Sequence, residues 1–233
     1  MRRMAMWDEF GVIFGSYILG SIPFIYIIGR LKGVDLREYE DMHIALWQQF
    51  GRSLAFAATW TDFLKGVAAV LIARHAFGLA PGWVAFAGVA AVAGQMWSVF
   101  MKFDGEKGNS IGLAMSGTLA TKTMFFGLIP IVTGFGVRTL PRFFTRNQTV
   151  DERLKFGGPP SLSLPLGMLG GFVVMPLAAW GLGQPPEVVI AFVGLVLLII
   201  LRRLTAGVRE DLRKPSGKVG MLLNRFLFDR SEI

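Results

Sequence analysis

Long apolar stretches alternate with short charged ones along the chain. Five stretches carry no charge or almost none, and four of these are 19 to 25 residues long. Since a bilayer core about 30 Å thick needs roughly 20 apolar residues per helix, the pattern predicts membrane-spanning helices. The stretches are residues 10–29, 53–73, 83–101, 159–183 and the shorter 188–201.

Residues 111–137 form a further apolar region that two arrangements fit. The region is 27 residues long, with Lys122 and Thr123 near its middle and Pro130 later. It could be one helix, or two short helices folded back on each other. Its hydrophobic pattern alone does not decide between them.

The positions of Lys and Arg decide this point. Cytoplasmic loops of membrane proteins carry an excess of both residues. Of the 24 Lys and Arg, 19 fall in the segments 30–52, 102–110, 138–158 and 202–233. Both 102–110 and 138–158 can face the cytoplasm only if 111–137 enters the membrane and returns. We therefore predict two short helices or a re-entrant hairpin there, with a break near 121–123.

The predicted fold class is an all-α, polytopic membrane helix bundle of about seven membrane segments. The N-terminus is expected outside and the C-terminus inside. Residues 1–233 form a single membrane domain, in which 138–158 is a surface loop and 202–233 is a basic cytoplasmic tail.

Composition narrows the function. The chain is 53% hydrophobic and 17% charged, against about 25% charged in soluble proteins, which argues against a water-soluble enzyme. The net charge of +8 indicates basic loops against anionic membrane lipids, and no nucleic acid partner is expected. There is no cysteine, which excludes disulfides and thiolate ligands. We expect no metal cluster and no cofactor.

The segment 102–112, KFDGEKGNSIG, is a candidate phosphate-binding loop at a membrane face. Its glycines would let the backbone approach a ligand, its lysines supply positive charge, and a following helix would present free N–H groups. The alternative is an ordinary glycine-rich turn with lysines that reach the membrane surface. The candidate residues are Lys102, Gly105, Lys107, Gly108, Asn109 and Ser110.

Two further features carry candidate chemistry. Asp62 and Lys65 lie within a predicted spanning helix, three residues apart, so they face the bundle interior together and are expected to pair as a structural ion pair. His43, in the charged linker 32–52, is a candidate general base, although a structural role is more common for a lone interfacial histidine.

The first predicted helix combines small residues with a proline. Gly15, Ser16, Gly20 and Ser21 would allow close helix packing. Pro23 predicts a kink that leaves a backbone carbonyl free.

Several segments together resemble the bacterial membrane glycerol-3-phosphate acyltransferases that use acyl phosphate, the PlsY family. Residues 19–38 are similar to that family's first helix and 62–66, DFLKG, to its D-x-L-K-G. Residues 94–108 are similar to its third helix and second motif, and the segment from Ser161 resembles a third motif, S-L-x-S. The resemblance implies acyl transfer from acyl phosphate to glycerol 3-phosphate, giving lysophosphatidic acid, in a bacterial inner membrane.

The resemblance implies a binding role for Lys107, which we count with His43 as a catalytic candidate. Ser21, Arg52, Ser161 and Ser163 are also counted as substrate-binding candidates. Membrane lipids are the remaining expected partners.

The chain also departs from the family. Residues 40–48 stand where the family reads roughly G-S-G-N-I-G-A-T-N, Glu106 replaces a glycine, and Gln95 replaces a histidine. The family's C-terminal His and Asn are missing from 202–206. Two alternatives therefore stay open: a non-catalytic paralogue that binds lipid or partner enzymes, and a small transporter that uses Asp62 and Lys65.

Overall fold

The structure is a computed structural model that describes residues 6–39, 41–145, 149–153, 161–213 and 217–231. These residues are mostly helical and include no strand. The α-helices are α1 (Met6–Ser21), α2 (Phe24–Leu31), α3 (Met42–Phe50), α4 (Arg52–Leu71), α5 (Pro81–Met96), α6 (Asn109–Leu119), α7 (Thr121–Phe143), α8 (Val150–Arg153), α9 (Ser163–Gly181), α10 (Pro186–Thr205), α11 (Val208–Asp211) and α12 (Lys218–Phe228).

Six stretches of the described chain are long and apolar enough to cross a membrane. They confirm the predicted all-α bundle, and the chain is a multi-pass membrane protein. The predicted total of about seven membrane segments remains a prediction, because α6 has only 11 residues. The side of the membrane on which each segment begins also remains a prediction. The stretches are Trp7–Leu31, Arg52–Ala76, Pro81–Met101, Thr121–Phe143, Ser163–Gly181 and Pro186–Thr205.

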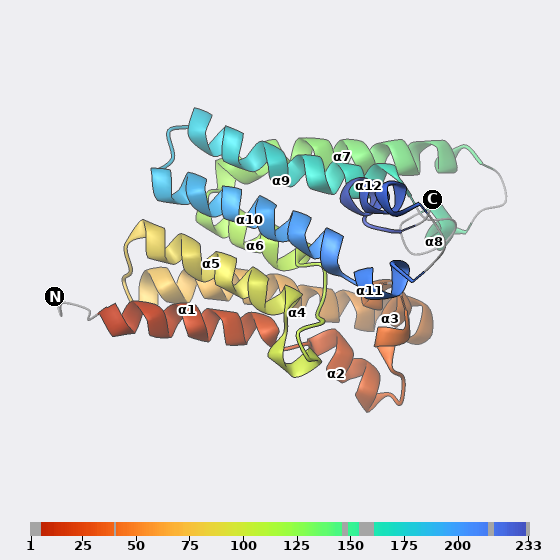
Figure 1. Cartoon of the computed structure of the whole chain (residues 1–233), viewed down its shortest axis with the longest axis horizontal. Helices are drawn as coiled ribbons and strands as arrows, with labels where there is room; N and C mark the ends of the chain where they lie inside the picture. Colours follow the sequence, from red (N-terminus) through yellow and green to blue (C-terminus); the bar gives the residue numbers. More distant parts are fainter. Residues whose placement is uncertain (1–5, 40, 146–148, 154–160, 214–216, 232–233) are drawn as a thin grey trace.

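The helices pack in layers around α6 and α10 (Figure 1). Helices α1, α4 and α5 lie on one side of this pair, and α7 and α9 lie on the other. The largest buried side chains, Phe172 of α9 and Phe192 of α10, fill the centre together with Met115 of α6. Large apolar side chains such as Phe125, Leu177 and Trp180 stay exposed, as expected for a surface that faces lipid.

The predicted interruption of 111–137 is present. Helix α6 ends at Leu119 and α7 begins at Thr121, so the break lies at Ala120, just before the expected 121–123. The guanidinium of Arg74, in the π-helical turn Ile72–Ala76 that follows α4, lies 3.4 Å from the carbonyl oxygens of Thr118 and Leu119 and donates to them. A cation at this point stabilises the free carbonyls of a helix C-terminus.

Helix α7 is longer than predicted. It was expected to be short and to end at a surface loop of 138–158, but it continues to Phe143, with Arg138 and Thr139 buried. Pro130 and Pro141 lie inside it, so the prolines did not mark its end. Helix α8 lies within the same expected loop, whose residues 146–148 and 154–158 fall outside the described part of the chain.

The predicted kink at Pro23 separates α1 from α2. Helix α1 ends at Ser21 and α2 starts at Phe24. The carbonyl oxygen of Ile22 accepts a hydrogen bond from Lys65 Nζ at 2.9 Å. The lysine of α4 therefore satisfies a backbone acceptor that the kink exposes.

The small residues of α1 do not act alike. A Cβ added at Gly20 would lie 1.9 Å from the carbonyl oxygen of Ala91 in α5, whereas one added at Gly15 would meet nothing within 4 Å. Only Gly20 of this pair therefore permits the close contact between α1 and α5.

We expect Gly20→Ala to lower the free energy of unfolding by about 1–3 kcal/mol, because the two helices must separate. Gly15→Ala is the matched control, since it makes the same change on the same helix in open space. Unfolding of both variants in detergent measures the difference. Equal stability of the two variants would contradict the packing described.

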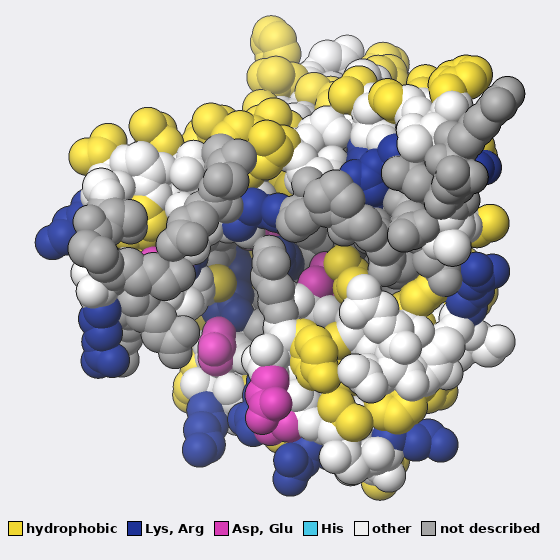
Figure 2. Space-filling model, turned by 90° about the vertical axis from the view of Figure 1, so that its right-hand side faces the viewer, with side chains coloured by type: hydrophobic (Ala, Val, Ile, Leu, Met, Phe, Trp, Pro, Cys, Tyr) yellow, Lys and Arg dark blue, Asp and Glu magenta, His cyan; other side chains and the backbone are white. Residues whose placement is uncertain are grey.

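The predicted basic segments gather at one end of the bundle. Figure 1 places α2, α3, α8, α11 and α12 at its right-hand end, and Figure 2 shows Lys and Arg side chains around this end. The segments that the charge pattern assigned to one membrane face therefore lie together. We call this the charged end; its assignment to the cytoplasm remains a prediction.

Candidate active site

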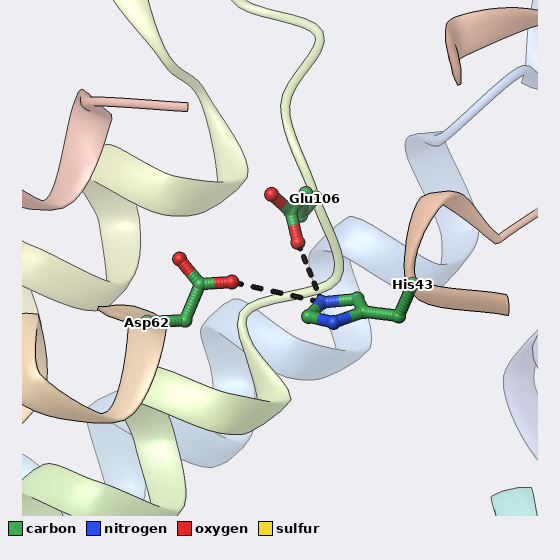
Figure 3. Close-up of side chains that lie close together, drawn as sticks. All are labelled: His43, Asp62 and Glu106. Atoms are coloured by element: carbon green, nitrogen blue, oxygen red, sulfur yellow. Dashed lines mark hydrogen bonds and ion pairs between the residues drawn. The ribbon is translucent and has the colours of Figure 1, made fainter. Parts of the chain in front are cut away.

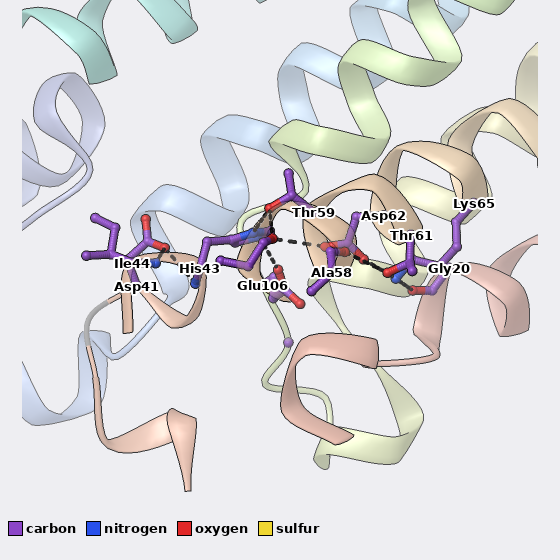
Figure 4. A network of polar contacts seen from close by, with 12 residues as sticks. Gly20, Asp41, His43, Ile44, Ala58, Thr59, Thr61, Asp62, Lys65 and Glu106 are labelled. Carbon is purple, nitrogen blue, oxygen red and sulfur yellow. Dashed lines mark hydrogen bonds and ion pairs between the residues drawn. The ribbon is translucent and has the colours of Figure 1, made fainter. Parts of the chain in front are cut away.

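A short helix carries His43 into the charged end. The side chain of Asp41 caps α3 by accepting hydrogen bonds from the backbone N–H groups of His43 (3.0 Å) and Ile44 (3.2 Å). Asp is a preferred N-cap because its carboxylate satisfies N–H groups that the first turn leaves free. The cap starts α3 so that the imidazole of His43 points toward α4 (Figure 4).

Two carboxylates face this imidazole. His43 Nε2 lies 2.9 Å from Glu106 Oε2 and 3.6 Å from Asp62 Oδ2 (Figure 3). Its Nδ1 lies 3.0 Å from the hydroxyl oxygen of Thr59. Because both ring nitrogens are engaged, His43 could act as a general base only after Nε2 left Glu106.

The surroundings of His43 act on its pKa in opposite directions. Burial lowers the pKa, but the hydrogen bond and charge of Glu106, helped by the charges of Asp41 and Asp62, outweigh burial and raise the pKa above its usual value. The resulting stabilisation of the folded chain is present below the ordinary histidine pKa and is lost as the pH rises through the raised one.

Asp62 and Lys65 pair as their spacing predicts. Lys65 Nζ lies 2.7 Å from Asp62 Oδ1, and the two side chains are 3% and 0% exposed. The ammonium also donates to the carbonyl oxygens of Gly20 and Ile22. The pair thus joins α4 to the kink between α1 and α2. Both charges are engaged in this structural contact, which does not favour the transporter alternative.

The glycines of the candidate phosphate loop fit against α5. A Cβ at Gly105 would lie 2.1 Å from the carbonyl oxygen of Gln95, and one at Gly108, where φ is +77°, would lie 2.4 Å from Met96 Cε. We expected these glycines to let a ligand approach. At these two glycines the loop lies directly against the protein's own helix α5, and a ligand contact there stays a prediction.

Arg202 holds this loop from the opposite side. Its guanidinium donates to the carbonyl oxygens of Gly105 (2.5 Å) and Glu106 (3.2 Å) and to Asp104 Oδ1 (2.8 Å). The planar guanidinium presents several N–H groups in a fixed geometry, so one side chain can fix three acceptors. Arg202 is therefore a positioning residue for the loop.

The lysines of the loop differ in their surroundings. Lys107 Nζ lies 2.8 Å from Asp229 Oδ2 at the end of α12, and its side chain is 38% exposed. Lys102 is exposed in a left-handed backbone conformation. Asn109 and Ser110, partly buried, begin α6. Lys107 and the N-terminus of α6 therefore lie close together along the chain, as predicted for a phosphate site. The carboxylate of Asp229 occupies the position beside Lys107 that a phosphate would take.

The other substrate-binding candidates lie in different surroundings. Ser21 is buried and donates to the carbonyl oxygen of Tyr17 within α1. Arg52 is exposed, with its guanidinium 5.8 Å from the ring centroid of Trp47. The hydroxyl oxygens of Ser161 and Ser163 lie 3.1 Å apart at the start of α9. The hydroxyl of Ser163 also donates to the carbonyl oxygen of Gly134. Ser21 and Ser163 therefore serve helix packing in this structure.

A family comparison agrees with this arrangement. The model of the family described as "Glycerol-3-phosphate acyltransferase" matches residues 10–209. The chain belongs to the glycerol-3-phosphate acyltransferase family. The match includes the candidate phosphate-binding loop 102–112, which we call the Gly/Lys loop, together with the Asp62–Lys65 pair and Arg202, and it ends before α12.

Individual members of the glycerol-3-phosphate acyltransferase family are similar to the chain. "Glycerol-3-phosphate acyltransferase 4" of Dehalococcoides mccartyi strain 195 is 32% identical over 174 residues, which cover 73% of this chain and 87% of that protein. The Geotalea daltonii protein of the same family name is 35% identical over 129 residues, 54% of this chain. That alignment and the one with the Geobacter metallireducens protein span 61% of each relative's length.

Two solved acyltransferase structures share the fold. The crystal structure of PlsY, an integral membrane glycerol 3-phosphate acyltransferase, in its glycerol 3-phosphate form has a TM-score of 0.67. It is 24% identical, and the match covers 88% of this chain and 90% of PlsY. The lysophosphatidic acid form gives a TM-score of 0.65 at 23% identity. At these identities the likeness establishes the fold alone.

Sequence reasoning missed several groups that complete the candidate site. Glu106 was seen only as a departure from the family glycine, yet it contacts His43, 63 positions away. Thr59 carried no signal as one of several polar residues in a spanning helix. The sequence did contain a signal for Arg202. An arginine in the last turn of a strongly apolar helix needs hydrogen-bond acceptors nearby, and Arg202 is buried in the structure.

Proposed function

We propose that this chain transfers an acyl group from acyl phosphate to the 1-hydroxyl of glycerol 3-phosphate, giving lysophosphatidic acid at the inner membrane of a bacterium. The observation that carries the proposal is the family match over residues 10–209, which includes the Gly/Lys loop held by Arg202 at the charged end. The acyl phosphate has a long apolar chain and glycerol 3-phosphate is doubly anionic, so the reaction needs a site at the boundary between the lipid and the charged end of the bundle.

The site supplies positioning and electrostatics. Lys107 and the backbone N–H groups at the start of α6 would hold a phosphate, while the acyl chain lies between helices. The hydroxyl oxygen then bonds to the acyl carbon as the bond from that carbon to the phosphate oxygen breaks, and the departing phosphate takes up the hydroxyl proton. Holding both substrates in line and stabilising the charge that develops accounts for catalysis without a covalent intermediate.

One observation favours a second function. Lys107 is already paired with Asp229, and two carboxylates lie close together here, Glu106 of the loop and Asp62 of α4. These charges oppose the binding of a phosphate. A family member without activity, which binds lipid or a partner enzyme, would keep the same bundle.

Growth of a bacterium depleted of its own acyl-phosphate-dependent acyltransferase separates the two functions. We expect the wild-type chain to restore growth and Lys107→Ala to fail, because the variant loses the cation that holds the phosphate. Lys122→Ala, an exposed lysine on α7, is the matched control and should restore growth. Wild-type chain present in the membrane at normal level without growth would favour the non-catalytic function.

A further inference from the structure

Three side chains from separate segments meet beneath the Gly/Lys loop. His43 comes from α3, Asp62 from the middle of α4 and Glu106 from the loop itself (Figure 3). One ligand-type atom of each lies within 4.8 Å of the other two. The proposed acyl transfer assigns none of them a chemical role.

The hydrogen bonds around His43 determine which nitrogen carries a proton. The Thr59 hydroxyl donates to the carbonyl oxygen of Ala55 at 2.9 Å, so its oxygen can only accept from His43 Nδ1. Nδ1 is therefore protonated. In a neutral ring, Nε2 then points its lone pair at the carboxylate oxygens of Glu106 and Asp62 (Figure 4).

With a neutral imidazole, the three atoms bring two carboxylates and a nitrogen lone pair close together, an arrangement that a positive charge between them would stabilise. A proton on Nε2 would serve Glu106 at 2.9 Å but would leave Asp62 Oδ2, at 3.6 Å, beyond hydrogen-bond length. Asp62 is fully buried, and its Oδ2 accepts no hydrogen bond from the described residues. Lys65 pairs with Oδ1, so Oδ2 is the atom that faces the cluster.

A bound metal ion satisfies all three atoms. Nitrogen and oxygen ligands lie about 2.0–2.2 Å from Zn²⁺, which places neighbouring ligands roughly 3.0–3.5 Å apart. The two separations at His43 Nε2, 2.9 and 3.6 Å, are within a few tenths of an ångström of this range. Thr59 provides the outer contact that fixes the ring of a metal-binding histidine.

We propose that His43 Nε2, Asp62 Oδ2 and Glu106 Oε2 bind one divalent transition-metal ion. One imidazole and two carboxylates suit ions such as Zn²⁺ or Mn²⁺ better than Mg²⁺. Two carboxylates beside Lys65 and a neutral imidazole sum to one negative charge, so the ion leaves a net positive charge behind the loop. That charge would favour a phosphate there, a consequence that rests on the proposed function.

Metal binding to the full-length protein in detergent tests the site without substrate. After chelation and desalting, we expect one Zn²⁺ per chain by calorimetry, and visible absorption of Co²⁺ typical of nitrogen and oxygen ligands. His43→Gln and Glu106→Gln should weaken Zn²⁺ binding at least about tenfold. His75→Gln is the matched control, because His75 is the only other histidine of the chain and lies in the exposed segment after α4.

Thr59→Val provides a variant that leaves all three ligands in place. It removes the acceptor of Nδ1–H and should weaken Zn²⁺ binding about tenfold while the protein elutes as the wild type does. Binding that is absent in the wild type, or equal in His43→Gln and His75→Gln, would overturn the site. An inactive protein that binds Zn²⁺ would support the site and remove only the proposed acyl transfer. A protein that transfers the acyl group but binds no Zn²⁺ would support the proposed function and overturn the metal site.

Discussion

Lys65→Met is expected to lower the free energy of unfolding by about 3–5 kcal/mol. The methionine keeps the apolar stem but removes the ammonium, which lies 2.7 Å from Asp62 Oδ1 and donates to the carbonyl oxygens of Gly20 and Ile22. A fully buried carboxylate and two backbone acceptors then lose their cation together. Unfolding of the detergent-solubilised protein in sodium dodecyl sulphate measures the loss.

A double variant separates loss of the pair from loss of packing. Asp62→Asn with Lys65→Met removes both charges, so no uncompensated charge remains, and it should recover a large part of the stability that Lys65→Met loses. A double variant that is as unstable as the sum of the two single variants would show that the two side chains do not interact.

Arg202→Met is expected to lower the acylation rate about 100-fold while the protein stays folded. Three acceptors of 104–106 lose their donor, and a displacement of reacting groups by about 1 Å can cost that factor. Lysophosphatidic acid formed per minute by purified protein measures the effect. The acylation rate of Arg202→Lys should lie between those of the wild type and Arg202→Met, because an ammonium cannot match the fixed geometry of a guanidinium.

Arg74→Met is the matched control for this prediction. Arg74 also donates to backbone carbonyls, but at the opposite end of α6. Its loss should reduce stability and leave the rate per folded molecule nearly unchanged. A similar loss of rate in both variants would mean that Arg202 supports the bundle in general and has no particular effect on the loop.

The local features of this bundle could be predicted from the sequence. The three-residue spacing of Asp62 and Lys65 places both on one face of α4. Pro23 cannot donate a backbone hydrogen bond, so the kink between α1 and α2 follows from it. The break near Ala120 followed from charge, since the basic segments 102–110 and 138–158 had to meet at one face.

The contacts that build the site could not be predicted in this way. Arg202 meets Glu106 across 96 positions, and His43 meets Glu106 across 63. Such contacts depend on how α3, α10 and the loop pack, which no local pattern records. The contact of the loop glycines with α5 could not be predicted for a related reason, because a close backbone approach looks the same in sequence whether the neighbour is a ligand or a helix.

The central claim is that this chain catalyses acyl transfer at the Gly/Lys loop, and formation of lysophosphatidic acid by the purified protein tests it most directly. The assay supplies acyl phosphate and glycerol 3-phosphate, with acyl coenzyme A in a parallel arm, and identifies the product by mass. We predict product that requires both substrates and falls about 100-fold in Lys107→Ala but not in Lys122→Ala. Wild-type protein that forms no more product than Lys107→Ala with either donor would contradict the account.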